Sequence, residues 1–114
     1  LGVWPKPSWA LRSPGQLEVL AGTQFDLRVG ETAVNYTGKT RPAITVNGSV
    51  PAPILRWREG TRVQLRVRND LPRGSIHGSS TSIHWHGILL PANMDGVPGL
   101  SFDGIGRGES YLYE

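Results

Sequence analysis

The chain has 114 residues, a formal net charge of +3 at pH 7 and no cysteine. This length accommodates one ordinary domain and excludes two, and the lack of thiols excludes disulfides and thiolate metal sites within the chain. No apolar run approaches the ~18 residues of a membrane-spanning helix, and no signal peptide is visible. With 15 glycines, 9 prolines and 38% hydrophobic residues, the composition favours a β-rich fold with many turns.

The basic character of the chain comes mainly from arginines, and the pI is near 9.8. Many of these arginines alternate with apolar residues, as they do on the solvated face of a strand, and no aromatic stacking platform is interleaved with them. We therefore expect no nucleic-acid partner. The arginines concerned are Arg56, Arg58, Arg62, Arg66 and Arg68.

Residues 1–15 are rich in proline and tryptophan, which predicts an extended leader that packs through its indole rings. The tryptophans are Trp4 and Trp9. The domain itself is predicted to cover residues 16–114.

Alternation of apolar and polar residues predicts strands from residue 16 onward, most clearly over residues 24–29. Gly30-Glu31 is predicted to turn, and Asn47-Gly48 is a favoured tight-turn pair. The prolines of Pro51-Ala52-Pro53 remove backbone donors and exclude a helix there. The chain is thus expected to cross an edge or a corner of the sheet at this point.

Two further strands are predicted over residues 54–58 and 62–68. The second of these would direct Val63, Leu65 and Val67 inward. A polar loop should follow over residues 69–80, and it contains His77. We expect His77 to be an exposed loop histidine, because nothing in the sequence places a second ligand beside it.

The segment Ser82-Ile83-His84-Trp85-His86-Gly87 carries the other two histidines in a short apolar run that predicts a strand. Side chains alternate along a strand, so His84 and His86 should share one face, with Cα atoms about 6.5–7 Å apart. Two imidazoles so placed can bind one metal ion or two neighbouring ions, and the spacing does not choose between these. They could also be two hydrogen-bonded histidines on a half-exposed strand. Imidazole suits copper, zinc, iron and nickel, so the pair does not identify a metal.

Residues 91–108 form a glycine-rich series of turns, and residues 109–114 begin another strand. No segment has the 3.6-residue periodicity of a helix, and no repeat is present. The prediction is therefore all-β, with short strands that suit a Greek-key sandwich or barrel.

Several segments resemble the multicopper oxidase family, most closely its bacterial copper-resistance group (the CopA/PcoA type). The HWHG segment followed by Pro91-Ala92-Asn93-Met94-Asp95-Gly96-Val97-Pro98-Gly99 resembles the family's first copper-ligand segment, and residues 46–56 and 60–69 resemble its N-terminal domain. The similarity extends over residues 22–114. It implies a cupredoxin domain that is incomplete at its C-terminal end, so that a sheet edge would stay open to pairing with another chain.

The resemblance also implies a chemistry. Family members hold a trinuclear copper site with His-x-His pairs between their first and last cupredoxin domains. His84 would bind the type 2 copper and His86 one of the type 3 pair, and Asp95 matches an outer-sphere carboxylate that supplies protons. For Asp95 an ordinary Asp-Gly turn is an equal alternative. Met94 and Trp85 are expected to pack in the core.

A parent protein of this kind would be periplasmic and would oxidise Cu(I) or phenolic donors while reducing dioxygen to water. The 114-residue chain alone is expected to be inactive, because it offers two cluster ligands and no electron-entry copper. Its partners would be the remaining cupredoxin domains, copper and dioxygen. Two alternatives stay open: a small periplasmic copper-binding or carrier module without redox catalysis, and a structural β-domain with no metal role.

Overall fold

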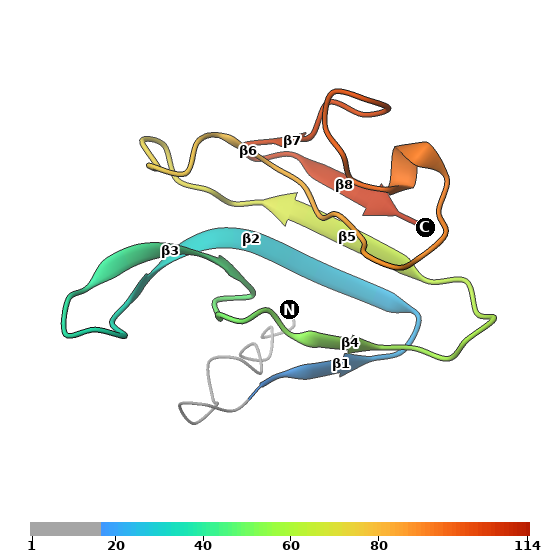
Figure 1. Ribbon diagram of the computed structural model, residues 1–114, viewed down its shortest axis with the longest axis horizontal. Coiled ribbons are helices and arrows are strands. Elements are labelled where there is room, and N and C mark those ends of the chain that lie inside the picture. The colour runs from blue at the N-terminus through green and yellow to red at the C-terminus, as the bar shows by residue number, and fades with distance from the viewer. Residues whose placement is uncertain (1–16) are drawn as a thin grey trace, which may run out of the picture.

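The computed structural model describes residues 17–114, and the expected leader over residues 1–15, with Trp4 and Trp9, lies outside them. The described part is built almost entirely of short strands (Figure 1), which confirms the all-β prediction. In chain order the elements are β1 (Val19–Ala21), β2 (Gln24–Val34), β3 (Arg41–Val46), β4 (Ile54–Arg56), β5 (Gln64–Asn69), β6 (Ser80–Thr81), the 3-10 turn η2 (Ala92–Met94), β7 (Ile105–Gly106) and β8 (Ser110–Tyr113).

The main sheet has the strand order β3-β2-β5-β8. Its central pair, β2 and β5, is parallel, and it sets Leu27 beside Val67. The outer pairs are antiparallel, and β8 is joined to β5 with Tyr113 opposite Leu65. Two smaller sheets complete the described part, a parallel pair of β1 with β4 and an antiparallel pair of β6 with β7.

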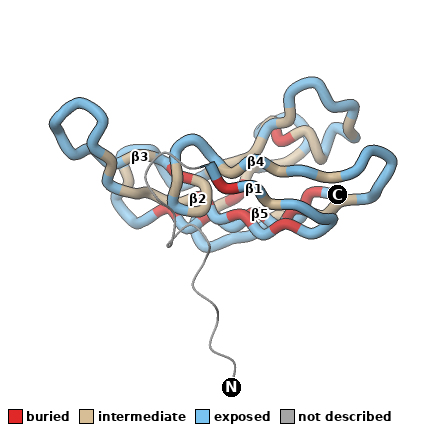
Figure 2. Tube along the Cα trace, turned by 90° about the horizontal axis from the view of Figure 1, so that it is seen from below, coloured by how far each residue is buried: buried red, intermediate tan, exposed pale blue. Residues whose placement is uncertain are grey.

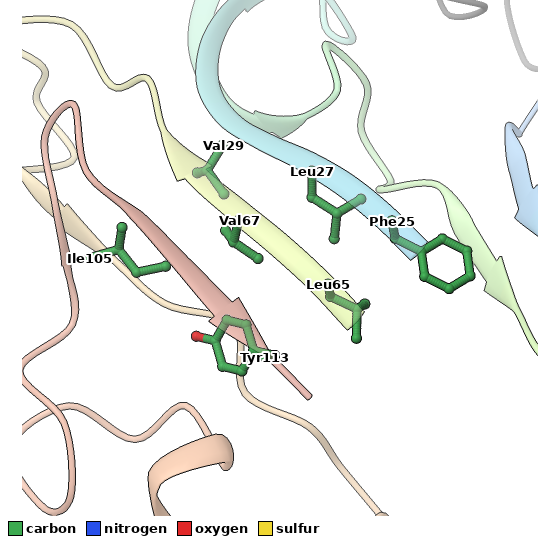
Figure 3. Close-up of a cluster of buried hydrophobic side chains, with 7 residues drawn as sticks. All are labelled: Phe25, Leu27, Val29, Leu65, Val67, Ile105 and Tyr113. Carbon is green, nitrogen blue, oxygen red and sulfur yellow. The ribbon is translucent and has the colours of Figure 1, made fainter. Parts of the chain in front are cut away.

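The core lies on one face of the main sheet, where alternate residues of β2 and β5 point the same way (Figure 3). Its buried members are Phe25, Leu27, Val29, Leu65, Val67, Ile105 and Tyr113. The β1–β4 pair lies in a second layer over this face (Figure 2), and it contributes Leu20, Leu55 and the neighbouring Trp57 to the packing. Two layers around one apolar core make a β-sandwich.

The predicted turn at Gly30-Glu31 is wrong, because both residues lie inside the 11-residue strand β2. The first part of β2 pairs with β5 as far as Val29, and from Val29 onward the strand pairs with β3 instead. Gly30 therefore lies where the strand changes partner and curves away (Figure 1). A glycine within a strand pattern marks either a turn or such a bend, and the pairing decides which.

The turn at Asn47-Gly48 is as predicted. Both residues have positive φ, 51° and 76°, and the flanking Val46 and Ser49 exchange backbone hydrogen bonds of 3.3 and 3.2 Å. Two consecutive positive φ values are what a two-residue hairpin of the I′ kind requires, and asparagine followed by glycine meets that need at low steric cost.

The strand β8 forms one edge of the main sheet: within residues 17–114 it pairs with β5 and with no strand on its other side. Such an edge strand presents backbone groups to which another strand can add. Across residues 17–114, no helix has the length and apolar character needed to span a membrane.

Candidate metal centre

The segment with His84 and His86 is not the strand that the sequence predicts: residues 82–85 belong to no regular element, and the chain bends at His86 and Gly87. Only the preceding β6 is paired, with Thr81 opposite Ile105 in β7. The next residue along the partner is Gly104, whose φ of +87° lies outside the β region, so the ladder ends there. Residues 82–85 continue without a partner strand from β6 towards η2 (Figure 1).

The alternation of side chains nevertheless persists through this segment. The imidazoles of His84 and His86 lie side by side, with ring centroids 4.8 Å apart and planes inclined by 72°. Trp85 between them packs on the core, with its ring 5.9 Å from that of Tyr113 in an edge-to-face arrangement. Trp85 therefore anchors the segment and leaves the two imidazoles at the surface.

The Nδ1 atom of His84 lies 2.6 Å from the backbone carbonyl oxygen of Asp95. A carbonyl oxygen can only accept a hydrogen bond, so Nδ1 must donate and carries the proton. In the neutral ring the lone pair then lies on Nε2, which is the nitrogen free to bind a metal. Among residues 17–114 no group hydrogen-bonds to the His86 ring, so neither of its nitrogens is committed in this way.

The carboxylate of Asp95 also lies beside His84, with its Oδ1 atom 3.6 Å from Nδ1. Both side chains are partly exposed, at 42% for His84 and 39% for Asp95. Asp95 at the same time ends the turn η2, where its N–H points to the carbonyl of Ala92. Asp95 therefore lies in a turn and also places its carboxylate beside His84. The proposed role of this carboxylate in proton supply stays a prediction.

Two tyrosines of β8 hold the loops around the histidines. The hydroxyl of Tyr113 accepts a hydrogen bond of 3.2 Å from the N–H of Ile83, and the hydroxyl of Tyr111 donates one of 2.7 Å to the carbonyl of Asn93. Burial raises the pKa of Tyr113; the hydrogen bond from Ile83 opposes this rise, and the nearby Tyr111 adds to it. The sequence alone did not identify these contacts.

Asn69 is a second residue that the sequence analysis missed. It is fully buried, and its amide nitrogen donates to the carbonyls of Ser79 (2.9 Å) and Ile105 (2.7 Å). Its Oδ1 atom accepts from the N–H of Leu71 at 2.9 Å. These bonds join the end of β5 to the β6–β7 pair that leads into the histidines. A signal was present, because Asn69 continues the inward register of Val63, Leu65 and Val67.

The third histidine takes no part in this centre. His77 is exposed in the loop after β5, as predicted, and its Nε2 atom lies 3.4 Å from the carbonyl of Pro42. Within the part of the chain that the structure describes, no three His, Asp or Glu side chains converge to hold a metal ion. The His84–His86 pair is thus two potential ligands, short of a complete binding site.

The family model described as "Multicopper oxidase" matches residues 28–114, and the chain belongs to this family. It is 60% identical over 113 residues to the copper resistance protein A homolog of Pseudomonas syringae pv. tomato, with 99% of this chain and 18% of that protein covered. Copper resistance protein A of Escherichia coli is 56% identical over 116 residues, with 99% and 18% covered.

Solved structures support the same assignment. The blue copper oxidase of Nitrosomonas europaea matches with a TM-score of 0.69 and 32% identity, over 80% of this chain and 28% of that one. The predicted cupredoxin-like sandwich is therefore confirmed. The chain spans about 18% of the length of the curated relatives it matches.

Proposed function

We propose that this domain acts within a longer polypeptide and contributes His84 and His86 as the first His-x-His pair of a trinuclear copper cluster. The observation that supports this most strongly is the placement of the two imidazoles side by side, 4.8 Å apart. His84 would bind the type 2 copper through Nε2, and His86 would bind one of the type 3 ions. The packing of Trp85 on the core and the hydrogen bond from His84 to Asp95 hold the segment that carries the two rings.

The donor set fits copper. Imidazole is a preferred ligand for copper, and the Nδ1–H of His84 is held by a carbonyl acceptor, as in well-ordered metal-histidine sites. The chain has no cysteine, so the electron-entry copper with its thiolate ligand would be held by other domains. When bound, the copper ions would supply the one-electron redox chemistry by which dioxygen is reduced to water.

The residues of this chain would then have separate tasks. His84 and His86 would hold the ions, Trp85 keeps the segment on the core, and the Asp95 carboxylate would accept and release protons near His84. The electrons would come from Cu(I) or phenolic donors. The relatives named copper resistance protein A favour a role in copper tolerance, and we place the protein in the periplasm.

The test is made in the full-length polypeptide with the double substitution His84→Ala/His86→Ala. We expect loss of the cluster copper and a fall of at least about 100-fold in dioxygen consumption. Removing the residues that bind the metal should cost no less than the 10–100-fold typical of a residue that only hydrogen-bonds to a ligand. His77→Ala is the matched control and should behave as the wild type. Unchanged copper content and unchanged turnover in the double variant would refute the proposal.

A second candidate is a copper-binding or carrier module without redox catalysis, and the surface position of both rings favours it. It predicts submicromolar copper affinity of the isolated chain without dioxygen consumption. The proposed oxidase role predicts that the isolated chain is inert, since it holds only one corner of the cluster. Titration with Cu(I) and Cu(II) also tests the remaining alternative, a structural domain with no metal role, which predicts no binding in any form of the protein.

A further inference from the structure

Gly96 brings the turn after η2 into direct contact with the backbone before His84. Gly96 is buried and has a φ of +73°. A Cβ atom added to it would overlap the carbonyl oxygen of Ile83, and would lie 2.6 Å from the carbonyl carbon of Ile83 and 3.1 Å from the Cα atom of His84. These neighbours are backbone atoms, so they cannot move aside as the end of a flexible side chain would.

The backbone of Ile83 is held from two sides. Its N–H donates to the hydroxyl of Tyr113 at 3.2 Å, and its carbonyl group faces Gly96. A side chain at position 96 could not be accommodated by a simple shift of Ile83, because that shift would strain the bond to Tyr113. The turn would have to withdraw instead, and Asp95 would move with it.

The close approach matters because of the atom that Asp95 presents. Its backbone carbonyl accepts the hydrogen bond from Nδ1 of His84 at 2.6 Å, whereas the carboxylate is farther from that nitrogen, at 3.6 Å. The backbone of Asp95, more than its carboxylate, therefore determines which ring nitrogen of His84 is protonated. That backbone can reach His84 only because residue 96 has no side chain.

We propose that Gly96 is a positioning residue for His84: its missing side chain allows the Asp95 carbonyl to reach Nδ1, and this selects the tautomer that offers Nε2 to the metal. The inference rests on the proposed function in taking His84 as a copper ligand. The assignment of the tautomer itself concerns the metal-free protein and can be tested without copper.

The variant that tests this is Gly96→Ala in the full-length polypeptide. Outer-sphere partners of a ligating histidine typically change metal affinity by about 10–100-fold, so we expect copper affinity at this centre to fall within that range. The electron paramagnetic resonance signal of the type 2 copper should also change, because the orientation of one ligand is no longer fixed. Copper affinity and signal equal to the wild type in a folded Gly96→Ala protein would overturn the inference.

Gly99→Ala is the matched control. Gly99 lies in the same loop and has a similar φ of +85°, but a Cβ atom there would meet nothing within 4 Å. Both alanines therefore carry the strain of a positive φ, and only the one at position 96 collides with backbone. Gly99→Ala should retain the copper affinity and the signal of the wild type. Equal losses in both variants would overturn the inference, because strain and not close approach would then be the cause.

A second measurement does not depend on whether the variant folds. Histidine-selective ¹⁵N labelling of the metal-free wild-type protein, with solid-state nuclear magnetic resonance, reports which ring nitrogen of His84 carries the proton. We expect the Nδ1–H tautomer, and observation of the Nε2–H tautomer would overturn the inference. This result is independent of the double-histidine test: if that variant kept its copper, the proposed function would fail while the tautomer assignment stood.

Discussion

The main sheet and the loop that carries the histidines are held in place in different ways. In the sheet, β2 and β5 share a continuous parallel ladder from Gln24 to Val29, and their inward side chains pack into one buried cluster. In the segment from Ser82 to Gly99, position depends on a few single contacts, such as those of Ile83 with Tyr113 and of His84 with Asp95.

We therefore expect the main sheet to determine the stability of the domain and the loop contacts to determine the positions of the histidines. Ladder bonds and apolar burial are numerous, so the sheet can lose one contact and keep its shape while the free energy of unfolding falls. The segment from Ser82 to Gly99 has few contacts. The loss of one of them should therefore move a histidine, while the free energy of unfolding changes only modestly. The following substitutions test this contrast, in order of decreasing effect on the free energy of unfolding.

Leu27→Ala should have the largest effect on stability. Leu27 is 4% exposed in the centre of β2, and truncation of a buried leucine costs about 2–5 kcal/mol. Denaturant unfolding of the full-length protein would measure the loss. Leu27→Met is the matched control and should cost less than about 1.5 kcal/mol. The contrast predicts that the folded Leu27→Ala protein keeps a wild-type copper signal; a changed signal would show that core and site are coupled.

Asn69→Ala should come next, and it should affect both regions. It would leave the carbonyls of Ser79 and Ile105 and the N–H of Leu71 without their partner. Each buried group left unsatisfied costs about 1–3 kcal/mol. Partial access of water to these groups should keep the total at about 2–4 kcal/mol. Asn93→Ala, which removes an exposed side chain, is the control. A loss no greater than in this control would contradict the structural role given to Asn69.

Tyr113→Phe should have a smaller effect on stability, of about 1 kcal/mol, because it removes one hydrogen bond and keeps the ring. We nevertheless expect a clear change in the copper signal, because Ile83, the neighbour of His84, loses its hydrogen bond to Tyr113. A wild-type copper signal in this variant would count against the importance of the Ile83 contact.

Tyr113 also predicts a pH dependence. Its pKa is raised in the folded protein, chiefly by burial, so above its ordinary value near 10 the unfolded chain loses this proton while the folded chain retains it. Stability is therefore constant with respect to this group below pH ~10 and falls as the pH rises towards the folded pKa. Unfolding measurements between pH ~9 and ~11 should show a shallower decline for Tyr113→Phe than for the wild type. Identical slopes would mean that the group does not contribute.

Arg66→Ala should have the smallest effect. Its guanidinium lies 4.0 Å from the carboxylate of Asp26, and both side chains are largely exposed. Exposed pairs of this kind contribute about 0–1 kcal/mol, and we expect a change within about 0.5 kcal/mol. A larger loss in the free energy of unfolding would indicate that the exposed face of the sheet contributes to stability.

The same division explains what the sequence could and could not predict. The inward register of Leu65 and Val67 follows from a period of two, which is local information. The course of β2 through Gly30 was missed because a glycine within a strand pattern is ambiguous until its partner strands are known. The strand predicted at His84 is absent for a similar reason. The ladder of β6 with β7 ends at Gly104, which is distant from His84 in the sequence.

At the site itself, alternation predicted that His84 and His86 share a face, and the rings do lie together. The Asp95 carbonyl was not predictable, because it is a backbone atom brought to His84 by the tertiary contact of Gly96. Asn69 could have been found: a polar residue in the inward register of a strand needs buried partners.

The most direct test is the location of copper in crystals of the copper-loaded, full-length polypeptide, by anomalous scattering at the copper absorption edge. We expect one ion bonded to Nε2 of His84 and a neighbouring ion bonded to His86, with Nδ1 of His84 still donating to the carbonyl of Asp95. Copper bound elsewhere, with both rings free of metal, would contradict it.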